Sequence, residues 1–204
     1  MTALLWMAVL PASASDIDAG WILRQLVQPV PSQTPFIELR GSALLKEPLR
    51  VSGQYRRPDA GTLVRAVQQP YRETTTIAGD QVTIEREGKP ARRFALSRAP
   101  ELADVQTSFG ALLGGDQALL QQHYRLSASG TPARWSLTLT PIAPALAKRV
   151  AGVVLHGQQQ ALTCIETRLQ RGEPQRTLLG PAAMAGEGVR DAAQLAALCR
   201  GPGA

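Results

Sequence analysis

Few side chains in this sequence of 204 residues combine the type and the spacing that catalysis or metal binding requires. Its two histidines, His123 and His156, have no cysteine, histidine or carboxylate partner at a metal-ligand spacing such as HxxxH or HExxH. The sequence contains no GxSxG nucleophile elbow, no P-loop and no GxGxxG fingerprint. Glu38 and Glu73 could form a carboxylate pair of the glycosidase kind, although glutamates in strands are more often solvated or paired with arginine. We therefore expect no metal, no cofactor and no enzymatic activity.

The two cysteines, Cys164 and Cys199, are thirty-five residues apart, which excludes a CxxC redox or zinc motif. In an oxidising compartment they could form a disulfide that ties the C-terminal tail to the strand before it. Two free thiols fit the sequence equally well, because the sequence does not tell how far apart the two Cβ atoms are.

The first fourteen residues resemble an export signal. Residues 3–14 read ALLWMAVLPASA, an apolar run that ends in the small-x-small pattern Ala12-Ser13-Ala14. The run is shorter than the roughly 20 apolar residues that a membrane-spanning helix needs. We expect a signal peptide over residues 1–14, cleavage after Ala14 and a periplasmic protein; the alternative is a buried helix. The residue directly after the predicted cleavage site is Ser15 and not a cysteine, so we expect no N-terminal lipidation.

The composition is that of a globular chain, with 44% hydrophobic and 19% charged residues. Aromatic residues make up only 4%, so aliphatic side chains must form the core, as they would an adaptable apolar cavity. The formal net charge is +6, but the arginines are scattered through the predicted strands without a basic run or a platform of stacking aromatics. We expect no binding to nucleic acid and only weak attraction to anionic membrane surfaces or substrates.

The elements that must position these residues are mainly short strands. Helical spacing predicts a first amphipathic helix over residues 15–27, which the prolines at 29 and 31 end. Alternation and turn residues then predict strands over 35–40, 49–56, 62–68, 73–77, 81–87 and 92–96. Regular short strands with tight turns are typical of an antiparallel meander.

The second half of the sequence begins with a different pattern. Residues 99–124 have helical periodicity that Gly114-Gly115-Asp116 interrupts, and Asp116 can cap the second of two helices. Strands are predicted over 135–140, 150–155 and 162–169, and a short helix over 189–199. We expect one α+β, mainly β, domain over residues 15–204, with about nine to eleven strands and helices that cover one face of the sheet.

Many weak motifs occur in the order and spacing of a known family. They include Phe36-x-Glu38-x-Arg40, Arg57-Pro58-Asp59, the run 79–84 (GDQVTI), Leu113-x-Gly115-Asp116 and the run 135–141 (WSLTLTP). Over residues 20–170 the sequence resembles LolA-like proteins, in particular stand-alone members whose genes often accompany aryl-polyene or lipid-modifying clusters. It departs from the family pattern at residues 171–174 (RGEP), which puts the last strands in doubt.

The resemblance implies an incomplete antiparallel β-barrel closed by a helical lid. Such a protein takes up acyl chains of lipoproteins at the inner membrane and releases them at the outer membrane, between an inner-membrane exporter and an outer-membrane acceptor. It implies a monomer in which Arg57 takes the place of the family's lid-holding arginine and gates the lid; the alternative is an ordinary exposed arginine at the end of a strand. The expected cavity-lining residues, for which ordinary core packing is the alternative, are Leu63, Val82, Leu102, Val105, Phe109, Leu112, Trp135, Leu137 and Leu139.

The same reasoning leaves other functions open. The cargo could be a lipid or an aryl-polyene biosynthetic intermediate instead of a lipoprotein. A hydrolase that acts on lipid or glycan would need an acid, a base or a nucleophile to converge in the cavity. A structural cell-envelope domain would need a filled core.

Overall fold

The computed structural model describes residues 17–40, 48–98, 112 and 115–201. The predicted signal peptide, residues 1–14, lies outside the described residues, as does most of the predicted lid insertion, including Leu102, Val105 and Phe109. No helix in the described part of the chain is long and apolar enough to cross a membrane.

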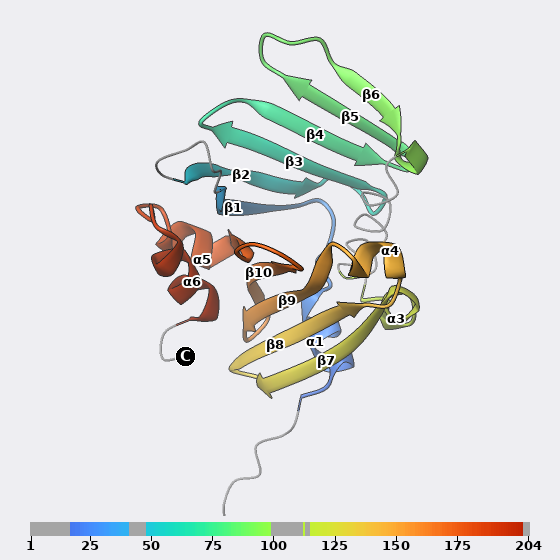
Figure 1. The fold of residues 1–204 in the computed structure, drawn as a ribbon, viewed down its shortest axis with the longest axis vertical. Coiled ribbons are helices and arrows are strands. Elements are labelled where there is room, and N and C mark those ends of the chain that lie inside the picture. Colours follow the sequence, from blue (N-terminus) through green and yellow to red (C-terminus); the bar gives the residue numbers. More distant parts are fainter. Residues whose placement is uncertain (1–16, 41–47, 99–111, 113–114, 202–204) are drawn as a thin grey trace, which may run out of the picture.

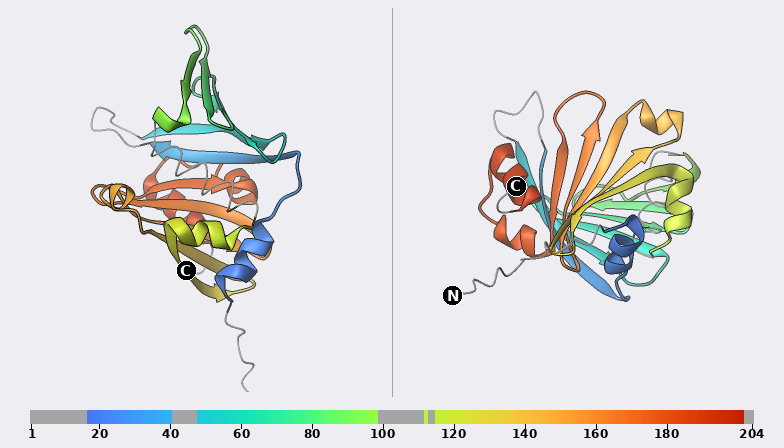
Figure 2. Two further views of the ribbon diagram at one scale, coloured as in Figure 1. Left: turned by 90° about the vertical axis from the view of Figure 1, so that its right-hand side faces the viewer. Right: turned by 90° about the horizontal axis from the view of Figure 1, so that it is seen from below.

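Eleven antiparallel strands form one sheet in the order β6-β5-β4-β3-β2-β1-β11-β10-β9-β8-β7 (Figure 1). The sheet curves strongly but its edge strands, β6 and β7, do not pair, so the barrel stays open (Figure 2). This confirms the predicted incomplete antiparallel barrel of a mainly β chain. The strands are β1 (Ser32–Arg40), β2 (Leu49–Arg57), β3 (Thr62–Gln69), β4 (Glu73–Ala78), β5 (Gln81–Arg86), β6 (Arg92–Ala95), β7 (Tyr124–Thr131), β8 (Arg134–Pro141), β9 (Val150–Gln158), β10 (Ala161–Leu169) and β11 (Gln175–Leu179).

The pairing of β1 with β11 joins the two halves of the sheet. Each half is a meander of sequential hairpins, β1 to β6 and β7 to β11. Phe36 and Ile37 of β1 lie opposite Leu179 and Leu178 of β11. Without this long-range pairing the chain would form two separate curved sheets, each too small to enclose much apolar volume.

The sequence did not predict two of the strands, β7 and β11. We expected residues up to 124 to be helical, but the helix ends at His123 and β7 begins at Tyr124. Apolar and polar residues do alternate in β7 from Tyr124 to Ser129, but the predicted helix takes in Tyr124 and no strand is predicted beyond it. The short β11 follows the turn at residues 171–174 and reads QRTLL, without the period-two alternation that is the main sequence signal of a strand.

Helices α1 (Ala19–Leu26) and α3 (Gln117–His123) cover part of the concave face of the sheet (Figure 2). Each begins at an aspartate whose carboxylate accepts a backbone N–H. Asp18 accepts from Trp21 at 2.6 Å, and Asp116 accepts from Leu119 at 2.9 Å. The second cap is the one that the sequence predicted. A 3-10 turn η1 (Leu96–Arg98) follows β6, and the short α4 (Pro144–Ala147) connects β8 to β9.

Helices α5 (Gly180–Ala185) and α6 (Ala192–Arg200) cover the opposite, outer face, where they pack on β1, β10 and β11 (Figure 1). The tail helix predicted over 189–199 corresponds to α6, whereas α5 was not predicted. Side chains from both helices and the three strands share one buried cluster, which contains Ile37, Leu39, Cys164, Leu178, Ala183, Val189, Leu195 and Cys199.

Candidate functional site

The concave face of β8 is the floor beneath α1 and α3. Trp135, Leu137 and Leu139, predicted to line a cavity, are 2%, 0% and 4% exposed and lie in one buried cluster. The cluster includes Leu112 and side chains of both helices, namely Ile22, Leu23, Leu26 and Leu120. In this conformation these predicted lining residues are buried against the two helices.

Trp135 is held in place by its backbone surroundings. Its indole nitrogen donates a hydrogen bond to the carbonyl oxygen of Gln159 at 2.8 Å. Gly157 lies opposite it in β9, and a Cβ atom there would come within 2.0 Å of the indole ring. The close approach of the ring to the strand therefore requires glycine at this position.

A small cavity opens beside the C-terminal end of α1. Its volume is about 50 Å³, well below the roughly 300 to 1,000 Å³ of ordinary ligand pockets, so an acyl chain can enter only if the covering helices move. Leu63 and Arg57, both predicted site residues, line it together. The full lining consists of Leu26, Gln28, Ser32, Thr34, Tyr55, Arg57, Leu63, Leu162 and Leu179.

Sequence reasoning missed several of these lining residues. Leu162 and Tyr55 lie in predicted strands. Whether their side chains share a face with Leu63 depends on how the strands pair, which the sequence did not tell. Leu179 lies at the end of β11, which was not predicted.

Val82 lies away from this cavity, on β5. It is 0% exposed and is paired with Ile77 of β4 and Phe94 of β6. Helix α1 contacts β7, β8 and β10, and α3 contacts β7. Neither helix packs extensively on β5. The predicted lining residues on the described strands therefore form two groups, one in each half of the sheet. Leu63 and Val82 lie on β3 and β5, and Trp135, Leu137 and Leu139 lie on β8.

Arg57 stands at the end of β2 with its Nη1 atom buried and without a hydrogen-bond partner in the described part of the chain. Its neighbour in the cavity wall is Tyr55, whose pKa is raised chiefly by burial. A raised pKa of this kind indicates a low local dielectric, in which an unmatched guanidinium donor is costly.

The inner face of β1 also carries a charged group. Glu38 pairs with the Nη2 atom of Arg65 at 2.5 Å and with the Nε atom of Arg40 at 2.7 Å. The guanidinium of Arg65 lies 4.7 Å from the ring centroid of Phe36, and this ring packs 4.9 Å from that of Tyr55. The carboxylate of Glu38 is thus neutralised by two arginines, and its ion pair with Arg65 links β1 to β3.

The arrangement of Glu38 and Glu73 does not fit a glycosidase. Glu73 lies on β4, three strands from Glu38 on β1, a separation of roughly 14 Å at the usual strand spacing. Catalytic carboxylate pairs lie roughly 5 to 9.5 Å apart. Glu73 instead faces Arg86, with 3.9 Å between the carboxylate and the guanidinium.

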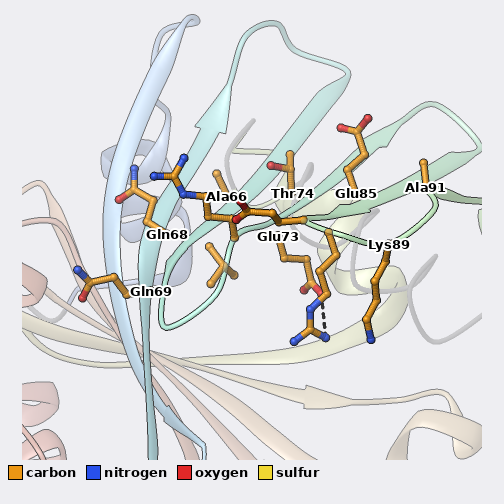
Figure 3. Close-up of a pocket in the computed structure, with 12 residues that line it drawn as sticks. Ala66, Gln68, Gln69, Glu73, Thr74, Glu85, Lys89 and Ala91 are labelled. Atoms are coloured by element: carbon orange, nitrogen blue, oxygen red, sulfur yellow. Dashed lines mark ion pairs between the residues drawn. The ribbon is translucent and has the colours of Figure 1, made fainter.

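A second hollow of about 750 Å³ lies at the far end of β3, β4 and β5 (Figure 3). Most of its lining is charged or carries amides, including Gln68, Gln69, Glu85 and Lys89. Figure 3 shows that Glu85 and Lys89 point away from each other. Its walls mix polar and apolar surface instead of forming the continuous apolar lining that an acyl chain needs, and its lining residues do not form a convergent set of reactive groups.

The structure joins Cys164 and Cys199 in a disulfide on the outer face of the sheet, away from the concave side. His156, Glu166 and Cys199 have potential ligand atoms within 4.8 Å of one another. They do not suit a metal ion, because the cysteine is oxidised and both Glu166 oxygens accept hydrogen bonds, from Arg168 at 2.8 Å and from Arg176 at 2.7 Å.

Two pKa shifts describe this outer cluster. Burial lowers the pKa of His156, so its imidazole stays neutral more readily than a free histidine. Burial alone would raise the pKa of Glu166, but the hydrogen bonds and charges of Arg168 and Arg176 outweigh it, and the net pKa is lowered. The cluster is therefore a structural ion network beneath α6.

The described residues thus form an open antiparallel half-barrel whose apolar concave face is covered by helices. The sequence profile described as outer membrane lipoprotein carrier protein LolA-like matches residues 11–203. The chain therefore belongs to the LolA-like family, as the motifs in its sequence predicted.

Solved structures resemble this chain more distantly. A LolA superfamily protein from Nitrosomonas europaea is 14% identical, with a TM-score of 0.41 over 80% of this chain and 92% of the other. The complex of MucA and MucB from Pseudomonas aeruginosa contains a chain that is 18% identical, with a TM-score of 0.41 over 80% of this chain and 56% of that one. No curated protein matches the sequence significantly.

Proposed function

We propose that this protein is a periplasmic carrier that takes up the acyl chains of a lipoprotein, or of a lipid, between the concave face of the sheet and α1. The observation that carries the proposal is the composition of that interface. Aliphatic and aromatic side chains of the sheet pack there against Ile22, Leu23 and Leu26 of α1, and the adjoining cavity is only about 50 Å³. Displacement of α1 would expose a continuous apolar surface, and none of the ion pairs between described residues involves α1.

The energies of this exchange are of comparable size. Exposing three buried aliphatic side chains costs roughly 5 to 9 kcal/mol, at about 1.5 to 3 kcal/mol for each. Burying an acyl chain of roughly sixteen carbons contributes about 12 kcal/mol, at about 0.8 kcal/mol per CH₂. An acyl chain can therefore replace α1 on the sheet, whereas a short apolar molecule cannot.

Within this proposal, Arg57 gates the lid and Leu63, next to it in the cavity wall, is the first side chain that the cargo meets. Trp135, Leu137, Leu139 and Leu112 line the space that α1 leaves, and Val82 extends the apolar surface toward β6. The acyl chain itself binds by area to plain aliphatic side chains, which allows its release to a more apolar acceptor.

The cellular setting is part of the same proposal. Residues 1–14 would direct export, and residues 15–204 would form the single carrier domain. A disulfide such as Cys164–Cys199 is typical of proteins in an oxidising compartment such as the periplasm. By family analogy, an inner-membrane exporter would load the carrier and an outer-membrane acceptor would receive the cargo.

A test combines native mass spectrometry with site-specific photo-crosslinking in the periplasm. The photoreactive residue replaces Leu63 in one variant and Arg56 in a control variant, because Arg56 precedes Arg57 in β2 and its side chain is exposed on the other face. We expect an acylated protein or a lipid bound to the mature chain, and crosslinks to it from position 63 only. Equal crosslinking from both positions, or an apo mass with no crosslinks, would contradict the carrier function.

The identity of the crosslinked molecule separates the two kinds of cargo. An acylated polypeptide would indicate a lipoprotein carrier, and a lipid of lower mass would indicate a carrier for a biosynthetic intermediate.

A further inference from the structure

The small cavity beside α1 combines an apolar lining with one charged group. Four leucines, Leu26, Leu63, Leu162 and Leu179, contribute to its wall. Among the described residues that line it, Arg57 alone carries a charge. A cavity with this lining matches a molecule that has an acyl chain and a polar head, more closely than it matches a plain hydrocarbon.

The charge of Arg57 is not balanced in the described part of the chain. Its Nη1 atom is buried and has no acceptor, and its guanidinium takes part in none of the ion pairs of the described residues. The acidic group on the neighbouring strand, Glu38, is already held by Arg40 and Arg65. A guanidinium remains charged at any physiological pH, so the donor cannot be made neutral by losing a proton.

We propose that Arg57 binds the anionic head of the cargo, a carboxylate or a phosphate, while the chain of that cargo lies along the leucines of the cavity and under α1. The inference rests on the proposed carrier function and adds the chemical class of the cargo. An anionic oxygen that accepts from Nη1 satisfies the buried donor and neutralises its charge. Charge-assisted bonds of this kind are roughly twice as strong as bonds between neutral groups.

Other head groups fit this position less well. A hydroxyl can accept the hydrogen bond but leaves the positive charge unbalanced in a region of low dielectric. A quaternary ammonium would be repelled by the guanidinium. The proposal therefore predicts a ranking of head groups on one and the same alkyl chain.

The experiment measures how twelve-carbon amphiphiles displace the neutral fluorescent probe N-phenyl-1-naphthylamine from the full mature protein. The competitors are dodecanoate, dodecyl phosphate, dodecanol and dodecyltrimethylammonium, each below its critical micelle concentration. We expect one or both anions to displace the probe at concentrations at least about tenfold below that of dodecanol, since a hydrogen bond to a charged group contributes this much affinity. A preference between the two anions assigns the head as carboxylate or phosphate.

Variants assign the preference to Arg57. R57Q should remove the higher affinity for the anions and leave the affinity for dodecanol unchanged. R57K, which keeps the charge, should retain part of the preference for anions. R56Q is the matched control, since it removes one positive charge from the exposed neighbour on the other face. It should change neither the affinity for the anions nor that for dodecanol. A role of Arg57 in lid gating alone would shift the affinities of all competitors together. Thermal melting by circular dichroism checks that each variant folds.

The possible failures can be told apart. Wild-type protein that binds the probe but does not prefer anions, or R57Q that weakens all competitors equally, would overturn the anionic head and leave the acyl carrier standing. No binding of the probe or of any amphiphile would overturn both.

Discussion

The same sheet has helices on both faces, but they are attached in different ways. On the outer face, α5 and α6 pack on β1, β10 and β11, and the disulfide between Cys164 and Cys199 joins α6 covalently to β10. On the concave face, α1 contacts β7, β8 and β10 through aliphatic side chains. In the described part of the chain, one cover is held by a covalent bond, whereas the other contacts the sheet through apolar side chains.

This difference indicates how a half-barrel can bind cargo without unfolding. The outer cover keeps β10 and β11 in place and thereby keeps the two halves of the sheet together. The inner cover can then be exchanged for an acyl chain, because its free energy of packing is of the same order as that of the cargo. Under the proposed carrier function, stability and release of the cargo belong to opposite faces of one sheet.

Removing the disulfide should have the largest effect on stability. The bond closes a segment of 35 residues, so its loss in the variant C164A/C199A should lower the free energy of unfolding by about 4 kcal/mol. Chemical denaturation followed by circular dichroism measures this change. Binding of the neutral probe should persist wherever the variant is folded. Loss of probe binding in folded protein would show that the two covers are coupled.

Equal substitutions in the two covers sharpen the comparison. L23A in α1 and L195A in α6 each remove a side chain that is no more than 3% exposed, and each should cost about 3 kcal/mol of stability. Only L23A should also change binding. It weakens the packing of α1, so the displaced state becomes more accessible and the affinity for an acyl chain rises. The two variants are compared by denaturation and by probe titration. An increase in affinity in L195A as well would contradict the assignment of binding to the concave face.

The ion network under α6 should have the smallest of these effects, and it depends on pH. The pKa of Glu166 is lowered in the folded protein, so its contribution is present above the pKa of the unfolded state and is lost as the pH falls through the folded pKa. At neutral pH, E166Q should therefore cost about 2 kcal/mol. Below roughly pH 4 the difference between E166Q and the wild type should shrink. Denaturation at a series of pH values measures both; a difference that is constant with pH would exclude an ionic role of Glu166.

The alternation of apolar and polar residues predicted most of the strands, and the turn residues between them predicted an antiparallel meander. Asp116 was predicted as a helix cap from its place after two glycines, and it does cap α3. These features are local, since a strand or a cap depends on residues within a few positions. The strand β7 was missed because the predicted helix extends through Tyr124, its first residue, whereas β11 lacks alternation of its own.

The candidate site was predictable only in part. Leu63 and Arg57 were named from the sequence and lie in the same cavity, whereas Leu26 and Leu179 joined them only in three dimensions. Trp135, Leu137 and Leu139 share one face, as their spacing predicted, but the sequence did not tell that α1 fills the space above them.

By itself, the sequence determined most of the segments that form strands, which residues share a face of a strand, and the family to which the chain belongs. The tertiary structure decided that β1 pairs with β11, that Cys164 and Cys199 are close enough to be joined, and that the buried Nη1 atom of Arg57 meets the cavity. The physical reason is distance along the chain. Alternation and capping are set by neighbours, while pairing, cover and burial depend on contacts between segments far apart in the sequence, from 35 residues between Cys164 and Cys199 to more than a hundred between Phe36 and Leu179.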